Sequence, residues 1–337
     1  MKLTLGQIKE ITSGAERIEE IDGLVRFCRF NEEQEKLYQE RNPYFHRNTF
    51  STAGIKLSFK TNSEKLCLKG NVLETSSRSY YSIDVFVNQK MIGCIDNFKV
   101  DEMKEDYTVN TCPIDGFLKE FALGEGEKTV TVYLPWSACV ELQDVIIDDD
   151  SYLEPVKYTK KLIAFGDSIT QGYDALRPSN RYVSRLAEKM QAEEFNKAIG
   201  GEVFFPELAK TKENFVPDYI VVAYGTNDWS GKEKDEFEKN CKEFYEALSK
   251  EYENSKIFAV SPIWRKDLRK ETKTGEFEYI EEYIKEVVSN LKNVTLISGY
   301  DLVPEEETYF ADLRLHPNDS GFEKQSERLY EKIKKYL

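Results

Sequence analysis

A serine and a histidine are the side chains in this 337-residue sequence best suited to nucleophilic chemistry. Ser168 comes directly after an apolar run and a Gly-Asp pair, and His316 comes shortly before the last amphipathic segment. A serine hydroxyl becomes a good nucleophile only when a base within hydrogen-bond reach takes its proton, and histidine is the usual base near neutral pH. Because the chain has only two histidines, the sequence favours acyl transfer at Ser168 with His316 as the base.

An acyl-transfer site also needs hydrogen-bond donors aimed at the developing oxyanion. Three candidates lie at predicted strand ends: the amide of Ser168, the amide of Gly201 and the side-chain amide of Asn227. A glycine in the second position lets a substrate approach the backbone closely. Gly201 would also suit an ordinary turn, and Asn227 an ordinary cap on the following helix. Their placement at the same sheet edge as the serine is what favours an oxyanion hole.

Alternating strand and helix patterns in the second half of the chain must position these residues. Short apolar runs predict buried parallel strands at residues 161–165, 195–199, 219–224, 257–260 and 294–297. Apolar residues at three- and four-residue spacing predict helices at residues 183–190, 237–252, 277–291 and from about 320 onward. Repeated strand–helix units give a three-layer α/β/α domain with a parallel sheet, and ligands bind at the carboxyl edge of such a sheet.

The first half of the chain consists of short apolar runs separated by turn residues. Ile55, Leu57 and Phe59 alternate with polar residues, which is the period of a half-buried strand. Further strands are expected at residues 65–68, 80–87, 91–95, 129–134 and 139–147. Regularly spaced short strands predict an all-β sandwich of the jelly-roll kind. A polar connector then divides the chain into a sandwich domain at 1–155 and an α/β domain at 156–337.

Two roles are open for the sandwich domain. It can cap and shape the neighbouring active site, or it can bind sugar, with the rings of Tyr80, Tyr81 and Trp136 as stacking faces. The second histidine, His46, also lies in this half. It has no acidic or cysteine neighbour at metal-ligand spacing, so we expect it to be structural or close to the substrate.

Composition excludes several classes of function. The formal charge of −14 repels phosphate backbones and anionic lipid, so neither nucleic acid nor a membrane surface is an expected partner. No signal-peptide core and no membrane-spanning segment is visible, which predicts a cytoplasmic protein. The cysteines form no C-x-x-C pair and have no histidine nearby, so the sequence predicts neither a metal site nor a disulfide framework. They are Cys28, Cys67, Cys94, Cys112, Cys139 and Cys241.

Four ordered blocks of residues together resemble the SGNH, or GDSL-type, hydrolases. The blocks are Gly166-Asp167-Ser168-Ile169, Asn196 with Gly201, Gly225-Thr226-Asn227-Asp228, and His316-Pro317-Asn318. The resemblance covers about residues 161–337. With a sandwich domain in front, the whole chain is similar to two-domain carbohydrate esterases of family 2, which remove acetyl groups from plant polysaccharides.

The resemblance implies a flavodoxin-like hydrolase domain that needs neither a metal nor an organic cofactor. It also implies Ser168 as nucleophile, His316 as base, and an oxyanion hole formed by Ser168, Gly201 and Asn227. In one place the sequence departs from the family pattern, which sets an aspartate three residues before the histidine. Here that position is Leu313, and Asp312 lies one residue earlier. Either Asp312 is the third member of a triad, or the site is a Ser-His dyad of the kind that some relatives use.

Substrate recognition depends on the segment that follows the strand at 257–260. Trp264 would stack on a sugar ring or, alternatively, pack against the sandwich domain, and Arg265 would hold a hydroxyl or a carboxylate. The same two roles, stacking on a sugar ring and packing against the sandwich domain, are open for Trp229.

The leading functional prediction is a serine esterase that removes acetyl groups from a soluble sugar or oligosaccharide, such as a xylan or mannan fragment. A thioesterase or lysophospholipase of the same fold would act on longer acyl chains. An acyltransferase would use the same serine. From a different class, the protein would mainly bind carbohydrate with an inactive hydrolase domain. The oligomeric state is not predicted.

Overall fold

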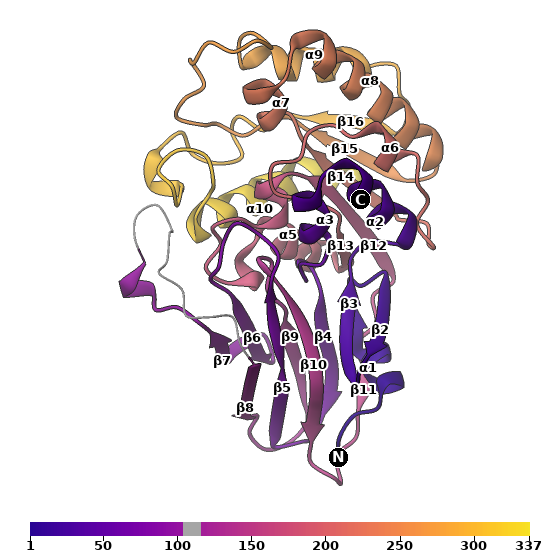
Figure 1. Ribbon diagram of the computed structural model, residues 1–337, viewed down its shortest axis with the longest axis vertical. Coiled ribbons are helices and arrows are strands. Elements are labelled where there is room, and N and C mark those ends of the chain that lie inside the picture. Colours follow the sequence, from indigo (N-terminus) through magenta and orange to yellow (C-terminus); the bar gives the residue numbers. More distant parts are fainter. Residues whose placement is uncertain (104–115) are drawn as a thin grey trace.

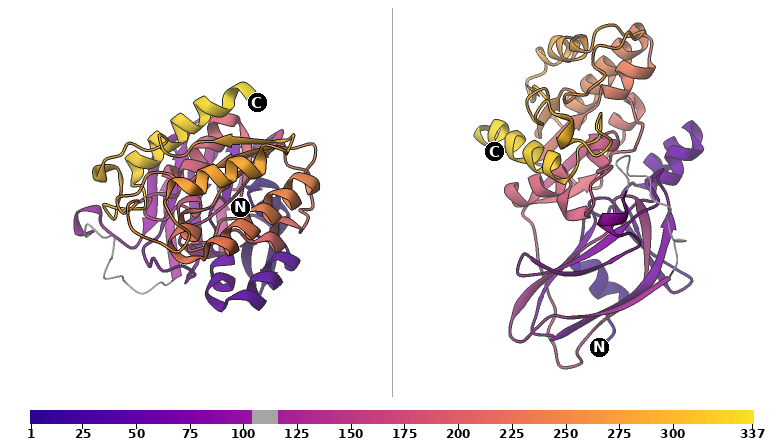
Figure 2. Two further views of the ribbon diagram at one scale, coloured as in Figure 1. Left: turned by 90° about the horizontal axis from the view of Figure 1, so that it is seen from above. Right: turned by 90° about the vertical axis from the view of Figure 1, so that its left-hand side faces the viewer.

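The computed structural model describes residues 1–103 and 116–337. Two antiparallel sheets occupy one end of the molecule, and a parallel sheet flanked by helices occupies the other (Figure 1). The two halves are stacked along the long axis, with the N-terminus at the far end of the antiparallel half (Figure 2). This arrangement confirms a sheet-rich first half followed by an α/β second half. Cys112 lies outside the described residues.

The first half is a pair of antiparallel sheets that face one another. Their strand orders are β1-β4-β9-β6-β7, with β11 also paired to β4, and β2-β3-β10-β5-β8. The strands are β1 (Thr12–Ser13), β2 (Arg17–Ile21), β3 (Leu24–Cys28), β4 (Lys56–Thr61), β5 (Lys65–Glu74), β6 (Ser82–Val87), β7 (Lys90–Asp96), β8 (Gly116–Ala122), β9 (Lys128–Tyr133), β10 (Ala138–Ile147) and β11 (Glu154–Pro155). One hydrophobic core lies between the sheets and includes Leu57 and Phe59, as their alternation predicts. The jelly-roll connectivity stays a prediction.

Within its described residues this half contains three α-helices, which were not predicted from the sequence. They are α1 (Leu5–Ile11), α2 (Glu32–Arg41) and α3 (Pro43–Thr49). α2 begins with a capping box, in which the Asn31 side chain accepts from the Gln34 amide and the Gln34 side chain accepts from the Asn31 amide. Tyr38 on α2 is buried in a core of the second half, and Phe45 on α3 packs against the same core. The helices α2 and α3 therefore cover part of the second half of the chain.

The second half has a parallel sheet with strand order β13-β12-β14-β15-β16, the 2-1-3-4-5 order of flavodoxin-like folds. Its strands are β12 (Lys160–Gly166), β13 (Ala192–Asn196), β14 (Tyr219–Ala223), β15 (Lys256–Val260) and β16 (Val294–Ile297). Its helices are α4 (Ser168–Gln171), α5 (Tyr182–Met190), α6 (Pro206–Ala209), α7 (Thr226–Gly231), α8 (Lys234–Glu251), α9 (Glu278–Val288) and α10 (Asp319–Ile333).

Helices cover both faces of this sheet. Leu162 and Ala164 of β12 pack in one core with α5 and α10, whereas the alternate residues Ile163 and Phe165 pack in another core with α8 and α9. A strand buried on both faces is continuously apolar, which explains the runs read from the sequence. The second strand, β13, ends at Asn196 and not at 199. Beyond it, the Lys197 amide still donates to β12, at Ala164 O (2.8 Å), but the chain has turned into a loop.

The cores of the two halves meet at their junction. Tyr80 and Trp136 from the sandwich are buried in the same core as Tyr173 from the α/β half. The Trp136 ring lies 4.9 Å from that of Tyr173, and its Nε1 donates to Ala175 O at 2.9 Å. Tyr81 is buried in the sandwich core. Tyr80, Tyr81 and Trp136 are therefore packing residues and present no faces for sugar stacking. Within the described residues, no helix has the length and apolar character needed to cross a membrane.

Candidate active site

Ser168 is the first residue of α4, directly after the tight turn at Asp167 that follows β12. Asp167 caps α4, with its Oδ1 accepting the Ile169 amide at 2.9 Å. A Cβ at Gly166 would lie 2.3 Å from Thr170 Oγ1, so only glycine fits where the strand ends. The turn places the Ser168 side chain, which is 6% exposed, at the carboxyl edge of the sheet.

His316 reaches this edge from a loop 148 residues further along the chain. Its Nε2 lies 2.9 Å from Ser168 Oγ. The loop is closed by a bond from the Ala311 amide to His316 O (2.8 Å) and by a bridge between Phe310 and Pro317. α10 begins just after it at the Asn318 cap. The pair read from the sequence is thus within hydrogen-bond distance.

Asp312 contacts the other side of the imidazole. Its Oδ2 lies 3.0 Å from His316 Nδ1, and its Oδ1 accepts the amides of Arg314, Leu315 and His316. Burial alone would raise the pKa of this carboxyl group, but the bonds to the His316 side chain and to backbone amides outweigh it and hold the pKa well below its usual range. The extra residue before the histidine is accommodated by Leu313, whose φ is 54°.

Asp174 is a second carboxylate at the same nitrogen, and it was not predicted from the sequence. Its Oδ2 lies 3.3 Å from His316 Nδ1, and its side chain is fully buried. Arg78 of the sandwich half holds it with two bonds, Nε to Oδ1 at 2.7 Å and Nη2 to Oδ2 at 3.0 Å. Although the Asp174, Asp312 and His316 ligand atoms lie within 4.8 Å of one another, the Arg78 guanidinium already supplies the positive charge there.

The oxyanion candidate Asn227 is hydrogen-bonded to the residue that follows the other candidate, Gly201. The Asn227 side-chain amide donates to the carbonyl of Glu202, the residue after Gly201, at 2.9 Å. Its second amide hydrogen is left for a substrate, because an amide nitrogen carries two. Gly201 has a φ of 86° and is exposed, and the ring of Phe45 on α3 lies 3.5 Å from the position its Cβ would take.

The loop that carries Gly201 is bound to the serine turn and to the sandwich half. The Gly200 amide donates to Gln171 Oε1 at 2.8 Å, and Gln171 Nε2 donates to Asn48 Oδ1 at 2.8 Å. The buried Arg29 donates to the carbonyls of Asn196 and Ala198, both at 2.9 Å. The sandwich half therefore helps to hold the candidate oxyanion loop.

A buried carboxyl group adjoins each of the three candidate donors in the sequence: Asp167, Glu202 and Asp228. Burial raises the pKa of Asp167 and of Asp228 to about 7 despite bonds from the Ile169 and Phe204 amides. Burial also raises the pKa of Glu202, although Arg41 of α2 lies 2.7 Å from its Oε1. The raised pKa values of Asp167 and Asp228 favour their protonation and so lower the negative charge at this edge of the sheet, whereas Glu202 pairs with Arg41.

The residues expected to bind substrate differ from one another in how deeply they are buried. Trp264 is half-buried, with its ring 5.2 Å from that of Phe310. Arg265 is 4% exposed, and its guanidinium is bound to both oxygens of Asp267 and to Thr226. These bonds favour a structural role for Arg265. Trp229 is also buried, with Nε1 donating to Gly275 O at 2.9 Å.

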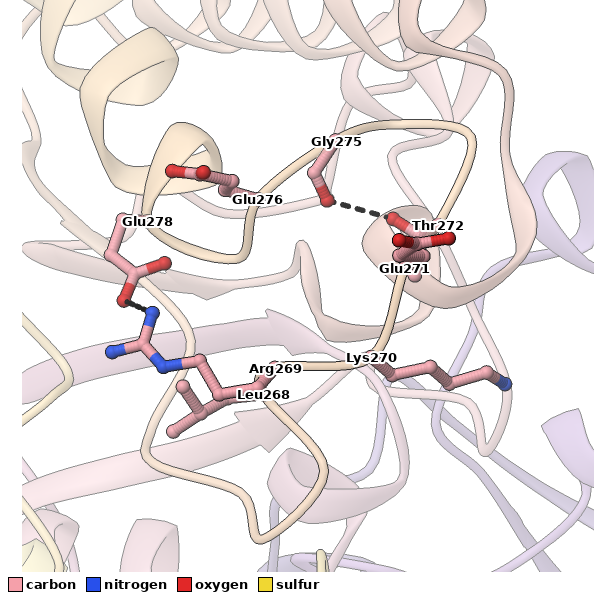
Figure 3. Close-up of a pocket in the computed structure, with 8 residues that line it drawn as sticks. All are labelled: Leu268, Arg269, Lys270, Glu271, Thr272, Gly275, Glu276 and Glu278. Atoms are coloured by element: carbon pink, nitrogen blue, oxygen red, sulfur yellow. Dashed lines mark hydrogen bonds and ion pairs between the residues drawn. The ribbon is translucent and has the colours of Figure 1, made fainter.

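Of the pockets in the α/β half, one near the predicted substrate segment and one beside the serine turn are lined by neither Ser168 nor His316. A pocket of about 420 Å³ lies on the loop between Arg265 and α9. Most of the side chains that line it are charged (Figure 3). An ion pair between Arg269 and Glu278 (2.6 Å) crosses it. A much smaller cavity, of about 20 Å³, borders the serine turn beside Asp167 and Ile169. The first pocket is a polar surface feature, and the second is too small to receive an acyl chain.

A serine and a histidine joined at the carboxyl edge of a flavodoxin-like sheet are the arrangement of an ester hydrolase. Residues 164–324 match the GDSL-like lipase/acylhydrolase family. The second half of the chain therefore has the fold and sequence pattern of that family, and the protein is a carboxylic ester hydrolase. No curated protein matches the sequence.

Solved structures extend the similarity over both halves. A salicylyl-acyltransferase from a tetracycline biosynthetic pathway is 18% identical, with 96% of this chain and 94% of that chain covered at a TM-score of 0.78. A GDSL-like lipase from Bacteroides ovatus is 19% identical (97% and 96% covered, TM-score 0.76). A family two carbohydrate esterase from Clostridium thermocellum is 14% identical (96% and 98%, TM-score 0.69). At these identities the likeness concerns the fold.

Proposed function

We propose that the protein removes O-acetyl groups from carbohydrates through an acyl-enzyme on Ser168. The observation that carries the proposal is the continuous chain from Ser168 Oγ through the imidazole of His316 to Asp312, with contacts of 2.9 and 3.0 Å. Such a chain is what a hydroxyl needs to act as a nucleophile near neutral pH.

In the first step Ser168 Oγ attacks the ester carbonyl carbon, and its proton passes to His316 Nε2. The carbonyl oxygen becomes an oxyanion, which accepts hydrogen bonds from the amides of Ser168 and Gly201 and from Asn227. Asp312 holds the Nδ1 proton and stabilises the imidazolium. The bond between the carbonyl carbon and the sugar oxygen then breaks, and His316 returns its proton to that oxygen.

In the second step a water molecule takes the place of the serine as nucleophile. The water oxygen attacks the acetyl carbonyl while His316 takes a proton from the water, and the same donors stabilise the second oxyanion. The bond to Ser168 Oγ breaks, the proton returns to the serine, and acetate leaves. Protonation of Asp167 and Asp228, whose pKa values burial raises to about 7, would reduce the negative charge near both oxyanions.

The choice of a carbohydrate ester rests on the fold relatives and on two partly exposed aromatic rings near the site. The Clostridium thermocellum esterase was solved in complex with cellohexaose, and another relative is an acetyl xylan esterase from Butyrivibrio proteoclasticus, 16% identical with a TM-score of 0.59. The half-buried rings of Phe45 and Trp264 belong to segments that adjoin Gly201 and the histidine loop. A partly exposed ring offers a sugar both an apolar face and access to water.

We also propose the division of the chain at 155/156, with the first domain completing the site of the second. An acyltransferase is the second candidate, because the salicylyl-acyltransferase shares the fold over nearly the whole chain. In that case an alcohol in place of water would take the acyl group.

The test is to measure acetate released from acetylated xylo-, manno- and cello-oligosaccharides, with Ser168→Ala as the inactive control. Hydrolysis that depends on Ser168 supports the proposal. A clear preference for p-nitrophenyl decanoate over the acetate would favour a long-chain acyl hydrolase. Transfer of the acetyl group to excess acceptor sugar would favour an acyltransferase. Failure of a fluorophosphonate probe to label Ser168 would favour a binding protein instead.

A further inference from the structure

The imidazole of His316 faces two carboxylates, although its Nδ1 carries only one hydrogen. Asp312 lies 3.0 Å from Nδ1 in hydrogen-bond geometry, and Asp174 lies 3.3 Å from the same atom. Asp174 is completely buried. Since one acceptor is enough to fix the imidazole, the second carboxylate calls for another explanation.

Two full negative charges beside one imidazole would favour its protonated form, because opposite charges within about 4–6 Å stabilise each other. A histidine that remains protonated cannot accept the proton of Ser168. The site therefore needs a positive charge that neutralises one of the two carboxylates. Arg78 provides this charge with a two-bond fork, of 2.7 and 3.0 Å, onto Asp174.

Arg78 is held firmly on the sandwich side of the junction. It lies between β5 and β6, where Ser76 Oγ accepts the Arg78 amide and donates to the Arg78 carbonyl, both at 3.1 Å. Its guanidinium carbon lies 5.5 Å from the centre of the Tyr173 ring. That ring in turn stacks on His316 at 5.8 Å. Arg78 thus touches both neighbours of the imidazole that come from the loop after α4.

We propose that Arg78 is a positioning residue for the esterase: it neutralises Asp174 and holds it against His316, so that the catalytic base is complete only when the sandwich domain is docked. The proposal rests on the proposed function in so far as His316 is the base. Arg78 acts through Asp174 and contacts no reacting atom. The sandwich domain then not only packs against the hydrolase site but also contributes the positive charge of Arg78 to it.

The charged and titratable groups around His316 come from four segments. Asp312 lies on its own loop, Asp174 and the stacked Tyr173 follow α4, and Arg78 enters from the sandwich. Asp167, next to Ser168, also interacts electrostatically with His316. Among these groups Arg78 is the positive one, so its removal changes the local charge most directly.

The experiment is an NMR titration of the His316 imidazole together with the pH profile of kcat/KM. The chain has two histidines, so His46→Gln leaves His316 as the only imidazole signal. In Arg78→Met the unpaired Asp174 should raise the imidazole pKa by about one pH unit or more, and the acid limb of activity should move up by the same amount. In Asp174→Asn the unpaired arginine should move both downward.

The double variant Arg78→Met/Asp174→Asn removes the pair as a neutral unit and should return both values close to those of the wild type. Arg177→Met is the matched control. Arg177 crosses the same junction to Asp96 (2.8 Å), and its side chain is 21% exposed, like that of Arg78. Loss of this pair loosens the junction without changing the charge on Asp174, so neither the pKa nor the acid limb should move.

Unchanged imidazole pKa values in both single variants, or equal displacements in Arg177→Met, would overturn the proposal. If Arg78→Met does not fold, Asp174→Asn decides: a lower imidazole pKa supports the proposal and an unchanged one overturns it. If the wild type hydrolyses no ester, the proposed function fails, and the imidazole titration still determines whether Arg78 sets the charge at His316.

Discussion

Asp312 binds His316 at two points, since its Oδ2 lies 3.0 Å from the imidazole Nδ1 and its Oδ1 accepts the backbone amide of the same residue at 3.1 Å. The carboxylate therefore fixes both the ring and the backbone of the histidine. The third member of a catalytic triad does the same, because it holds the imidazole in the tautomer in which Nε2 accepts the serine proton. A spacing of four residues does not prevent this contact.

Asp312→Ala is therefore expected to lower kcat by about 10⁴, the loss seen when the third member of a serine-protease triad is changed. The reason is that the imidazole loses its hydrogen-bond acceptor at Nδ1, leaving there only Asp174 at 3.3 Å, which is bound to Arg78, and that the loop loses the acceptor of three amides. The measurement is kcat on p-nitrophenyl acetate, with circular dichroism to establish folding. Asp267→Ala is a suitable control, because it removes a carboxylate that binds Arg265 instead. A decrease of only a few-fold would show that Asp312 is not an essential third member, and the loss of activity in Asp312→Ala/Asp174→Asn would then separate a Ser-His dyad from a triad completed by Asp174.

Leu313→Gly should stabilise the protein without loss of activity. Leu313 has a φ of 54° and is 39% exposed, and a left-handed conformation costs an L-residue about 1–2 kcal/mol. Glycine removes that strain and loses little buried surface, although its greater freedom in the unfolded chain offsets part of the gain. Thermal denaturation of both proteins measures the effect. Leu313→Val should instead lower the melting temperature, because a β-branched residue is strained further at this φ.

The sequence allowed the catalytic pair to be predicted because both residues lie beside patterns with a physical cause. Ser168 follows a strand buried on both faces, and His316 precedes an amphipathic helix. The parallel sheet and the edge where the residues meet follow from repeated strand–helix units. Asp174 and Arg78 carry no such pattern. Each resembles an ordinary polar loop residue, and their pairing across 96 residues of sequence arises only when the two halves are docked.

The helices α2 and α3 were missed for a related reason. α2 is highly charged, and Tyr38 on it is buried against a different half of the chain, so no amphipathic stripe stands out in the sequence. Its capping box, Asn31 with Gln34, was the available signal. The surroundings of Arg265 were likewise not readable from the sequence, and its role in substrate binding stays a prediction. Its position after β15 suggested a substrate contact, but sequence position does not reveal that Asp267 turns both of its oxygens to the guanidinium.

Asn227→Ala should lower kcat by about 10²–10³ with a smaller effect on KM, because an oxyanion donor acts mainly on the transition state. The side chain also binds Glu202 O next to Gly201, so part of the loss reflects a looser second donor. Steady-state kinetics on p-nitrophenyl acetate separates the two parameters. Asn214→Ala, which removes an amide bound to Glu16, should leave both unchanged. An increase in KM at constant kcat would place Asn227 in substrate binding and not in the oxyanion hole.

Asp167→Asn should stabilise the protein more at pH 8 than at pH 5. Burial raises the pKa of Asp167 in the folded protein to about 7, above its ordinary value of 3.8. The folded state then binds more protons than the unfolded state between these values, so the stability from this group is full at low pH and is lost as pH rises through about 7. Asparagine keeps an oxygen for the Ile169 amide and has no proton to lose. The melting temperatures of both proteins at the two pH values are compared, and an equal difference at pH 5 and pH 8 would contradict a protonated Asp167.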